Sequence, residues 1–344
     1  MTRIDPTELE DWARAVLAAI GAPDGIARAV AAHLVEANLK GHDSHGVGML
    51  PRYVRAAGLG ELVPDAEPAP LAEGPGFSRW DAGMGFGQAA MPAALGRAAG
   101  AMDGAAMVVT MRRAHHLGRI GHYAEAMAAR GLVSIFAVNV LGPPPRVAAH
   151  GGRGPSFGTN PWTVGIPADP PLLLDMATSA IAHGKARAAH EAGLPLLPGA
   201  AIGPDGRESL EAIDGHERGA LMPLGGSVAG HKGMGLAVMA EVLGGLMSGG
   251  AAVHDAPALD WGVRNDAMAI LIDPATMGAD LSAAAALADW LRARPAADGA
   301  RVMAPGDPER AATEERRSAG IPLPDGTRAL LDEAAAACGA PRLA

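Results

Sequence analysis

Residues 105–139 read AAMVVTMRRAHHLGRIGHYAEAMAARGLVSIFAVN, and this stretch decides the class of fold. Its first seven residues, AAMVVTM (105–111), form a short apolar run typical of a buried strand, and LVSIFAVN (132–139) is a second such run. Between them, residues 119–130 have the pattern of a helix. Because strands that alternate with helices are typical of a sheet covered by helices, we predict an α/β fold.

The same kind of pattern extends in both directions along the chain. We predict a helix over 5–20, which Asp5 can cap, and a second helix that ends near Leu39, before Gly41. Pro64 to Pro70 is a proline-rich connector. Further along, the sequence predicts helices over 87–102, 234–247, 309–318 and 326–338, a central strand over 267–272, and a loop over 295–308.

The composition limits the classes of function. The 344 residues carry a formal net charge of −9, which repels phosphate backbones, so we expect no nucleic-acid partner. The first residues are acidic, unlike a secretory signal, and no segment approaches the ~20 uninterrupted apolar residues of a membrane helix. The single cysteine, Cys338, cannot form an internal disulfide. We therefore expect a cytoplasmic protein with no membrane partner.

The first candidate site lies in GHDSHG (41–46), just after the second predicted helix. It gathers two imidazoles, a carboxylate and a hydroxyl on one short turn. Because the pKa of histidine lies nearest neutrality, His42 or His45 can give or take a proton at working pH. The alternative is that Asp43 or Ser44 only caps the next helix and that the histidines are solvated. The residues alone do not decide between these two interpretations.

The second candidate site runs from Arg112 to His122, where the predicted strand is followed by the predicted helix. Proteins of the α/β class commonly bind ligands at such strand ends, and the helix N-terminus adds backbone donors. The arginines of this segment can hold a carboxylate or a phosphate. Its histidines lack the spacing of a zinc site, so we predict no metal site. A solvated basic loop is the alternative interpretation.

Two further segments combine polar residues with the end of an element. LLLDMATSA (172–180) has the pattern of an apolar strand that ends in Asp175, where a ligand could meet backbone amides; an ordinary strand end and helix cap is the alternative. GHKGMG (230–235) precedes an apolar helix, and its glycines and Lys232 suit an anion. It is not a Walker loop, and the absence of a G-x-G-x-x-G after an early strand leaves a Rossmann fold unsupported.

Taken together, these segments resemble the malate/L-lactate dehydrogenase family of NAD(P)-dependent oxidoreductases. The resemblance implies a non-Rossmann α/β fold with a helical domain built from both termini. Residues 1–65 with 309–344 would form the helical, dimerisation domain of a homodimer, and residues 66–308 the α/β core that binds cofactor and substrate. The matching stretches occur in the family's order and are GHDSHGVGMLPRYV (41–54), HHLGRIGHYAE (115–125), FGTNPW (157–162), PLLLDMATSAIAHGK (171–185), GHKGMGLAVMAEVLGGLMSGG (230–250) and APGDPE (304–309).

The resemblance also implies the role of individual residues. A hydride passes between NAD or NADP and a small 2-keto or 2-hydroxy acid, with His45 as proton donor and acceptor and His116 as a second catalytic imidazole. A cation has to hold the substrate carboxylate, and Arg52 and Arg119 are the candidates. The implied cofactor contacts are His45, Arg119, Ile120, Gly121, Asp175, Met176, Ala177, Thr178, Ser179, His231, Lys232, Asn265, Pro305, Gly306 and Asp307.

Two departures from the family pattern leave the substrate open. Residues 139–145 (NVLGPPP) replace an Asn-Ser followed by an Ala-Pro-x-Gly-Gly loop, and residues 186–190 lack one of the family's cations. Both changes fall where the substrate or the 2′ position of the cofactor can be recognised, so NAD and NADP are both possible. Reduction of a cyclic imine carboxylate of the piperideine-2-carboxylate type is the alternative activity. A non-catalytic binding or assembly protein is disfavoured because the chain retains His45, His116, Asp175 and Lys232.

Overall fold

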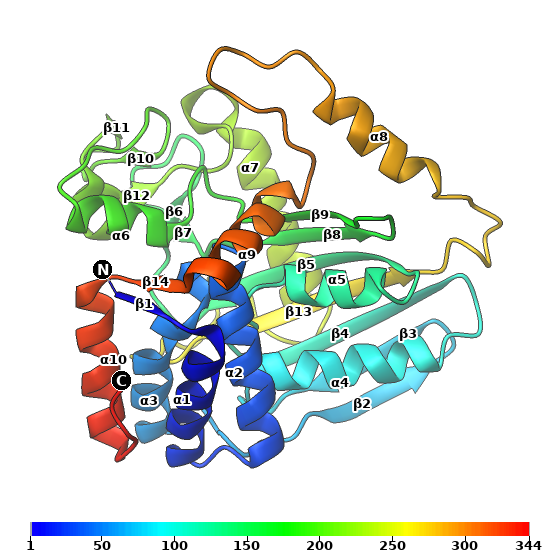
Figure 1. Cartoon of the computed structure of the whole chain (residues 1–344), viewed down its shortest axis with the longest axis horizontal. Coiled ribbons are helices and arrows are strands. Elements are labelled where there is room, and N and C mark those ends of the chain that lie inside the picture. The colour runs from blue at the N-terminus through cyan, green and yellow to red at the C-terminus, as the bar shows by residue number, and fades with distance from the viewer. Residues whose placement is uncertain (1, 344) are drawn as a thin grey trace.

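The computed structural model describes residues 2–343 and is built around a seven-stranded sheet (Figure 1). Its longest strands lie at the centre, where helices cover both faces, and most residues of the central strand β13 are therefore buried. In spatial order the strands are β2 (Ala69–Gly74), β3 (Phe77–Asp81), β4 (Ala106–His115), β13 (Arg264–Ile272), β5 (Val133–Leu141), β8 (Trp162–Ile166) and β9 (Leu172–Met176).

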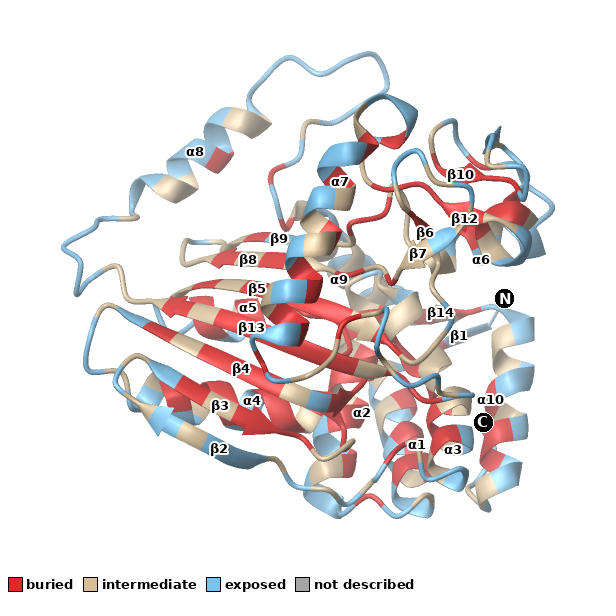
Figure 2. Cartoon of the chain, turned by 180° about the vertical axis from the view of Figure 1, so that it is seen from behind, coloured by how far each residue is buried: buried red, intermediate tan, exposed pale blue. Residues whose placement is uncertain are grey.

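The sheet combines parallel crossovers with one inserted strand. β3 and β4 are parallel neighbours, and β13 pairs antiparallel with both β4 and β5, so β4 and β5 also share one direction. The crossover helices α4 (Gly87–Gly100) and α5 (Gly121–Ala128) cover one face of the sheet (Figure 1). The opposite face is covered by α7 (Gly226–Ala240) and the π-helical turn η4 (Glu241–Leu246) (Figure 2). The predicted α/β class is confirmed.

Both ends of the chain meet in a helical region beside this sheet (Figure 1). Leu9, Leu34, Leu50 and Leu331 are buried in one apolar cluster, and each such side chain contributes about 1.5–3 kcal/mol by leaving water. The Trp12 Nε1 donates to the carbonyl of Pro341 at 2.8 Å, which fixes the C-terminus on the first helix. The region consists of β1 (Thr2–Ile4), α1 (Pro6–Ala19), α2 (Asp24–Leu39), α3 (Leu50–Gly58), β14 (Ile321–Leu323), which pairs with β1, and α10 (Asp325–Cys338).

A second, smaller sheet lies between α7 and the helical region (Figure 1). The helix α6 (His183–Glu191) and the π-helical turn η3 (Asp214–Arg218) pack against it. Its five strands are short, and in spatial order they are β11 (Glu208–Ser209), β10 (Ala201–Ile202), β12 (Ala220–Leu221), β6 (Val147–Ala148) and β7 (Pro155–Phe157).

The predicted helices and the predicted central strand are confirmed, although some bounds move. The helix predicted over 119–130 begins at Gly121, and the helix predicted over 234–247 begins at Gly226. No described helix combines the length and the apolar character needed to cross a membrane. Four further elements complete the fold: the 3-10 turns η1 (Asp43–His45) and η2 (Val47–Met49), the helix α8 (Ala283–Arg292), and α9 (Asp307–Ala319), which corresponds to the helix predicted over 309–318 and begins within the predicted loop.

Candidate active site

The turn that carries His45 is held by the last residues of α2. The Asn38 side chain donates through Nδ2 to Asp43 Oδ1 at 2.7 Å and accepts through Oδ1 from the Val47 N–H at 2.9 Å. Gly46 packs so closely that a Cβ there would lie 2.2 Å from Asn38 Oδ1, which only glycine allows. His45 is therefore half-buried on a fixed turn, in contrast to the solvated histidine of the alternative interpretation.

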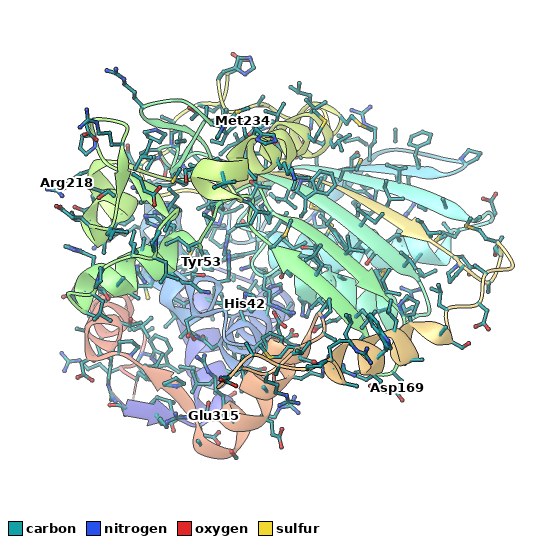
Figure 3. All side chains as sticks on the ribbon, turned by 90° about the horizontal axis from the view of Figure 1, so that it is seen from above. His42, Tyr53, Asp169, Arg218, Met234 and Glu315 are labelled. Carbon is teal, nitrogen blue, oxygen red and sulfur yellow. The ribbon has the colours of Figure 1, made fainter. Side chains whose placement is uncertain are left out.

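Four side chains form one hydrogen-bonded series, which we call the imidazole chain (Gln88, Tyr53, His116 and His45). His45 Nδ1 lies 3.2 Å from His116 Nε2, and the two rings are stacked with an interplanar angle of 12°. The Tyr53 hydroxyl lies 2.6 Å from His116 Nδ1, and Gln88 Nε2 donates to that hydroxyl at 2.7 Å. The side chains come from α4, α3, the residue after β4, and η1. Figure 3 shows Tyr53 and the neighbouring His42 between the small sheet and the large sheet.

Burial governs the ionisation of both imidazoles. It lowers the pKa of His45 to about 4; the Asp175 carboxylate opposes this shift, and the charges of His42 and Arg119 add to it. Burial, together with the neighbouring His45, also lowers the pKa of His116 well below its usual value. Both rings are therefore neutral at neutral pH. A neutral imidazole has one ring nitrogen that accepts a proton and one that donates a hydrogen bond.

The second part of the site is an ionic cluster (Arg119, Glu125, Glu36, Lys40 and Asp175). The Arg119 guanidinium is 1% exposed and lies 3.1 Å from Glu125, 3.6 Å from Glu36 and 3.8 Å from Asp175. Lys40 Nζ donates to both Glu125 oxygens at 2.8 Å. Burial alone would lower the pKa of Arg119, but the carboxylates outweigh it and raise that pKa. A substrate carboxylate would have to compete with them, and the substrate-binding role of Arg119 stays a prediction.

The strand end β9 meets the start of α5 at Asp175. The Gly121 N–H donates to Asp175 Oδ2 at 2.8 Å, and the Thr163 hydroxyl donates to Oδ1 at 2.8 Å. A Cβ on Gly121 would lie 2.6 Å from Arg119 Nη2 and 2.7 Å from Asp175 Oδ2, so the position has no room for a side chain. The structure thus gathers several predicted site residues at one edge of the large sheet: His45, His116, Arg119, Ile120, Gly121 and Asp175.

The segment 176–179, after β9, runs from the ionic cluster to the start of α7. The Thr178 N–H donates to the Thr159 carbonyl at 2.9 Å, and the Thr178 carbonyl accepts from the Leu224 N–H at 2.8 Å. Thr178 and Ser179 are buried, whereas Met176 at the strand end is half-buried. This segment and α7 therefore border the same edge of the sheet.

Three residues predicted to contact the cofactor differ in whether their side chains are exposed or already hydrogen-bonded within the fold. His231 and Lys232 are exposed on α7, and no hydrogen bond or ion pair among the described residues joins them to the imidazole chain. The Asn265 amide is used inside the fold, because its Oδ1 accepts from the Leu117 N–H and its Nδ2 donates to the Asn139 carbonyl, each at 2.9 Å. Asn265 thus fixes the strand exit that leads to the ionic cluster.

Pro305, Gly306 and Asp307 lie beside β9, where α9 begins. The Pro305 carbonyl accepts from a backbone N–H of β9 at 3.5 Å, and Gly306 has a φ of +91°, a conformation that suits glycine. The Asp307 carboxylate is held by Arg292 through two contacts of 2.9 Å and also by Arg310. The Asp307 side chain therefore ties α8 to α9.

Arg52 is directed toward the loop 260–262. Its Nη1 donates to the Trp261 carbonyl at 2.9 Å, and Glu61 accepts three backbone N–H groups of the same loop. Burial lowers the pKa of Arg52, and the charge of Arg52 is among those that lower the pKa of His116. Arg52 is thus within electrostatic reach of the imidazole chain, and its contact with a substrate stays a prediction.

Residues 4–332, nearly the whole chain, match the family model described as malate/L-lactate dehydrogenase. The chain belongs to this family. Hydroxycarboxylate dehydrogenase B of Escherichia coli O157:H7 is 40% identical over 98% of this chain and 95% of its own length. A Delta(1)-pyrroline-2-carboxylate/Delta(1)-piperideine-2-carboxylate reductase of Pseudomonas putida is 34% identical over 76% of this chain and 74% of its own length. A solved E. coli structure, provisionally described as a malate/lactate dehydrogenase, has a TM-score of 0.93 at 38% identity, covering 99% of this chain and 96% of that one.

Membership of the malate/L-lactate dehydrogenase family makes this chain an oxidoreductase, and its relatives support a dehydrogenase of 2-hydroxy acids. The structural match over nearly the full length also confirms the predicted family fold, with its helical part formed by both termini.

Some residues that build this malate/L-lactate dehydrogenase site were not predicted. Tyr53 lies within a quoted motif and Gln88 lies in a predicted helix, but their partners are distant in sequence, so no local spacing pairs them. The start of α6 was also missed. A Cβ on Gly184 would lie 2.8 Å from Ser44 Cβ, so this helix borders the turn that carries His45. The glycine in AHGK (182–185) was the one available signal.

Proposed function

We propose that the chain transfers a hydride between NAD or NADP and a small 2-keto or 2-hydroxy acid, with His45 as proton donor in reduction and proton acceptor in oxidation. The observation that carries this proposal is the contact of 3.2 Å between His45 Nδ1 and His116 Nε2. It engages one nitrogen of His45 within the protein, so Nε2 is the nitrogen that exchanges a proton with the substrate.

When bound, the nicotinamide supplies the hydride in reduction and takes it in oxidation. His45 performs the proton step: the oxygen of the substrate carbonyl gains negative charge and takes the proton from His45 Nε2. The Asp175 carboxylate stabilises the protonated ring, whereas the Arg119 guanidinium destabilises it. These two charges of the ionic cluster therefore shift the pKa of His45 in opposite directions.

The residues beside β9 fit a dinucleotide. Gly121 presents bare backbone next to Arg119 and Asp175, and Arg119 Nε is a buried donor without a hydrogen-bond acceptor among residues 2–343. The side chains of Asn265 and Asp307 are satisfied within the fold, so we propose that they shape this edge. The residues that would hold the cofactor are Arg119, Ile120, Gly121, Asp175, Met176, Ala177, Thr178, Ser179, His231, Lys232, Pro305 and Gly306.

Reduction of a cyclic imine carboxylate is the second candidate activity. The similarity to the Pseudomonas putida reductase favours it. A C=N bond also needs a proton donor, so His45 serves both reactions and does not discriminate between them. A panel of 2-keto acids and cyclic imine carboxylates, each tested with NADH and NADPH, separates the two activities by the rate at which the reduced cofactor is consumed. Absence of turnover on the whole panel, with no cofactor binding by calorimetry, would refute both.

The role of His45 is tested by the variant His45→Ala. Removing a positioned general acid or base lowers the rate by about 10²–10⁴-fold, and we expect kcat/KM to fall within that range while the thermal unfolding curve is unchanged. His254→Ala is the matched control, because His254 is exposed and lies outside both the imidazole chain and the ionic cluster. Equal rates in His45→Ala and His254→Ala would contradict the assigned proton step.

The assembly also belongs to this proposal. Large apolar side chains are exposed along α7 and η4 and favour self-association; they are Val228, Met239, Val242, Leu246 and Met247. We propose a homodimer, and light scattering of the purified protein measures its mass. The division into residues 1–65 with 309–344 and residues 66–308, the dimerisation role of the former, and the cytoplasmic location stay predictions.

A further inference from the structure

The hydrogen bonds of the imidazole chain run in one direction from donor to acceptor, and Gln88 at the end of the chain defines that direction. Gln88 Nε2 donates to the Tyr53 hydroxyl at 2.7 Å, so the hydroxyl hydrogen is free to be donated to His116 Nδ1, 2.6 Å away. His116 then carries its proton on Nε2 and donates it to His45 Nδ1 at 3.2 Å. In this direction neutral His45 carries its own proton on Nε2.

This direction does not suit the proton step. In oxidation His45 has to accept the substrate hydroxyl proton at Nε2, but that nitrogen already carries a hydrogen. In reduction His45 has to be protonated on both nitrogens, and its Nδ1–H would then face the Nε2–H of His116. Both productive forms of His45 therefore require that its Nδ1–H donates to His116.

The reversed chain satisfies this requirement with the same side chains. His45 Nδ1–H donates to His116 Nε2, His116 Nδ1–H donates to the Tyr53 oxygen, and the Tyr53 hydroxyl donates to Gln88 Oε1 once the amide has turned by half a rotation. With His45 neutral, both directions contain equal numbers of protons, and exchange with water interconverts them. Within the reversed direction, the catalytic cycle exchanges only the Nε2 proton with the substrate.

The surroundings of Gln88 permit the rotation. Gln88 is 1% exposed, and its Oε1 is a buried acceptor with no hydrogen-bond partner in the described part of the chain. No donor therefore holds the amide oxygen in its present place. Burial raises the pKa of Tyr53 far above its usual value, so Tyr53 keeps its hydrogen and only redirects it.

We propose that Gln88 is a positioning residue whose amide, a donor and an acceptor in one group, sets the direction of the imidazole chain and thereby which nitrogen of His45 carries the proton. This inference rests on the proposed role of His45. The other ionisable groups facing the two imidazoles do not change place between the directions; they are His42, Arg119 and Asp175 around His45, and His115, His33 and Arg52 around His116.

Two substitutions at Gln88 are expected to act in opposite ways. Gln88→Glu offers Tyr53 an acceptor oxygen and favours the productive direction, so the pKa seen in the pH profile of the oxidation rate should rise by about one pH unit. Gln88→Met removes the acceptor, which should lower that pKa and reduce kcat by about 3–10-fold, the effect of one lost hydrogen bond. Oxidation needs neutral His45, so the oxidation rate falls as the pH drops below the pKa of His45. A raised pKa therefore moves this fall to higher pH, and a lowered pKa moves it to lower pH.

Ring nitrogen chemical shifts give a readout that does not depend on turnover. They should show protonated Nδ1 on His45 and His116 in Gln88→Glu, and protonated Nε2 in Gln88→Met. The spectra of His45→Ala and His116→Ala assign the signals. The same ring tautomers in both Gln88 variants would overturn the inference.

A control for the added charge places Gln88→Glu in a Tyr53→Phe background, because Tyr53→Phe interrupts the imidazole chain. The pKa shift should disappear there, as expected when two residues act through one another. A shift that persists acts through space and overturns the role of Gln88, while the proposed function stands. An unchanged rate in His45→Ala would instead overturn the proposed function itself.

Discussion

The imidazole chain and the ionic cluster lie side by side, but they handle charge in opposite ways. The imidazole chain is neutral, because burial lowers the pKa of His45 and His116. The ionic cluster instead pairs opposite charges, because each of its carboxylates and cations lies beside a partner of opposite sign. A group that changes protonation during a reaction needs neighbours that tolerate both states, whereas a fixed charge needs partners that never change. The structure meets these two requirements with two separate sets of side chains.

The largest effect expected of this difference is on stability. Arg119→Met would leave Glu36, Glu125 and Asp175 together without their central cation, and breaking such a buried pair costs about 3–5 kcal/mol. Urea unfolding measures this loss. Arg119→Lys is the control, since it keeps the charge and should lose less. Equal stability of Arg119→Met and the wild type would show that the cluster is not the fixed unit described here.

The buried neutral histidines should make the folded protein less stable in acid. Burial lowers the pKa of His115 to about 3 from its usual value of 6.5, because the folded protein excludes the charged ring. The unfolded chain therefore binds the proton first, and stability present above pH 6.5 is lost as the pH falls toward 4, by ~3 kcal/mol from this residue. Urea unfolding at several pH values measures the slope.

The variant His115→Phe isolates this contribution. His115 packs edge-on against Tyr53 and Phe86, and neither ring nitrogen has a hydrogen-bond partner among the described residues. Phenylalanine keeps an aromatic ring but cannot be protonated. We expect a shallower loss of stability in acid, and a slope identical to that of the wild type would assign the acid sensitivity to other groups.

The smallest effect concerns the rim of the ionic cluster. Lys40 is 19% exposed and binds the Glu125 carboxylate from outside, so Lys40→Met should lower the free energy of unfolding by about 1–2 kcal/mol. The loss should shrink in high salt, because exposed charges are screened more than buried ones. A loss larger than that of Arg119→Met would reverse the order of importance that burial predicts.

Local sequence patterns predicted much of the fold and part of the site. The apolar runs at 105–111 and 132–139 correspond to β4 and β5, and the helix between them corresponds to α5. The insertion of β13 between these two strands was not predictable, because the strand comes more than a hundred residues later and its pattern does not name its partners. Strand order depends on long-range packing that periodicity does not encode.

The same limit applies to the site. Residue type made His45 a candidate and the resemblance to the family assigned the roles of His45 and His116, whereas the contact between them joins residues 71 positions apart. Arg119 was considered as a free cation for a substrate, and nothing local showed that Glu36 and Glu125 already surround it. The type of residue predicts which chemistry is available, but only the folded arrangement shows which groups are already engaged.

The joining of the two termini also affects how the protein becomes active during synthesis. Arg316, in α9, binds both oxygens of Asp43 at 2.6 and 3.0 Å and so braces the turn that carries His45. That turn leaves the ribosome well before α9 and the strand β14 that pairs with β1. A nascent chain thus contains its reactive histidine long before Arg316 can brace the turn, and full support of that turn has to wait until α9 is translated.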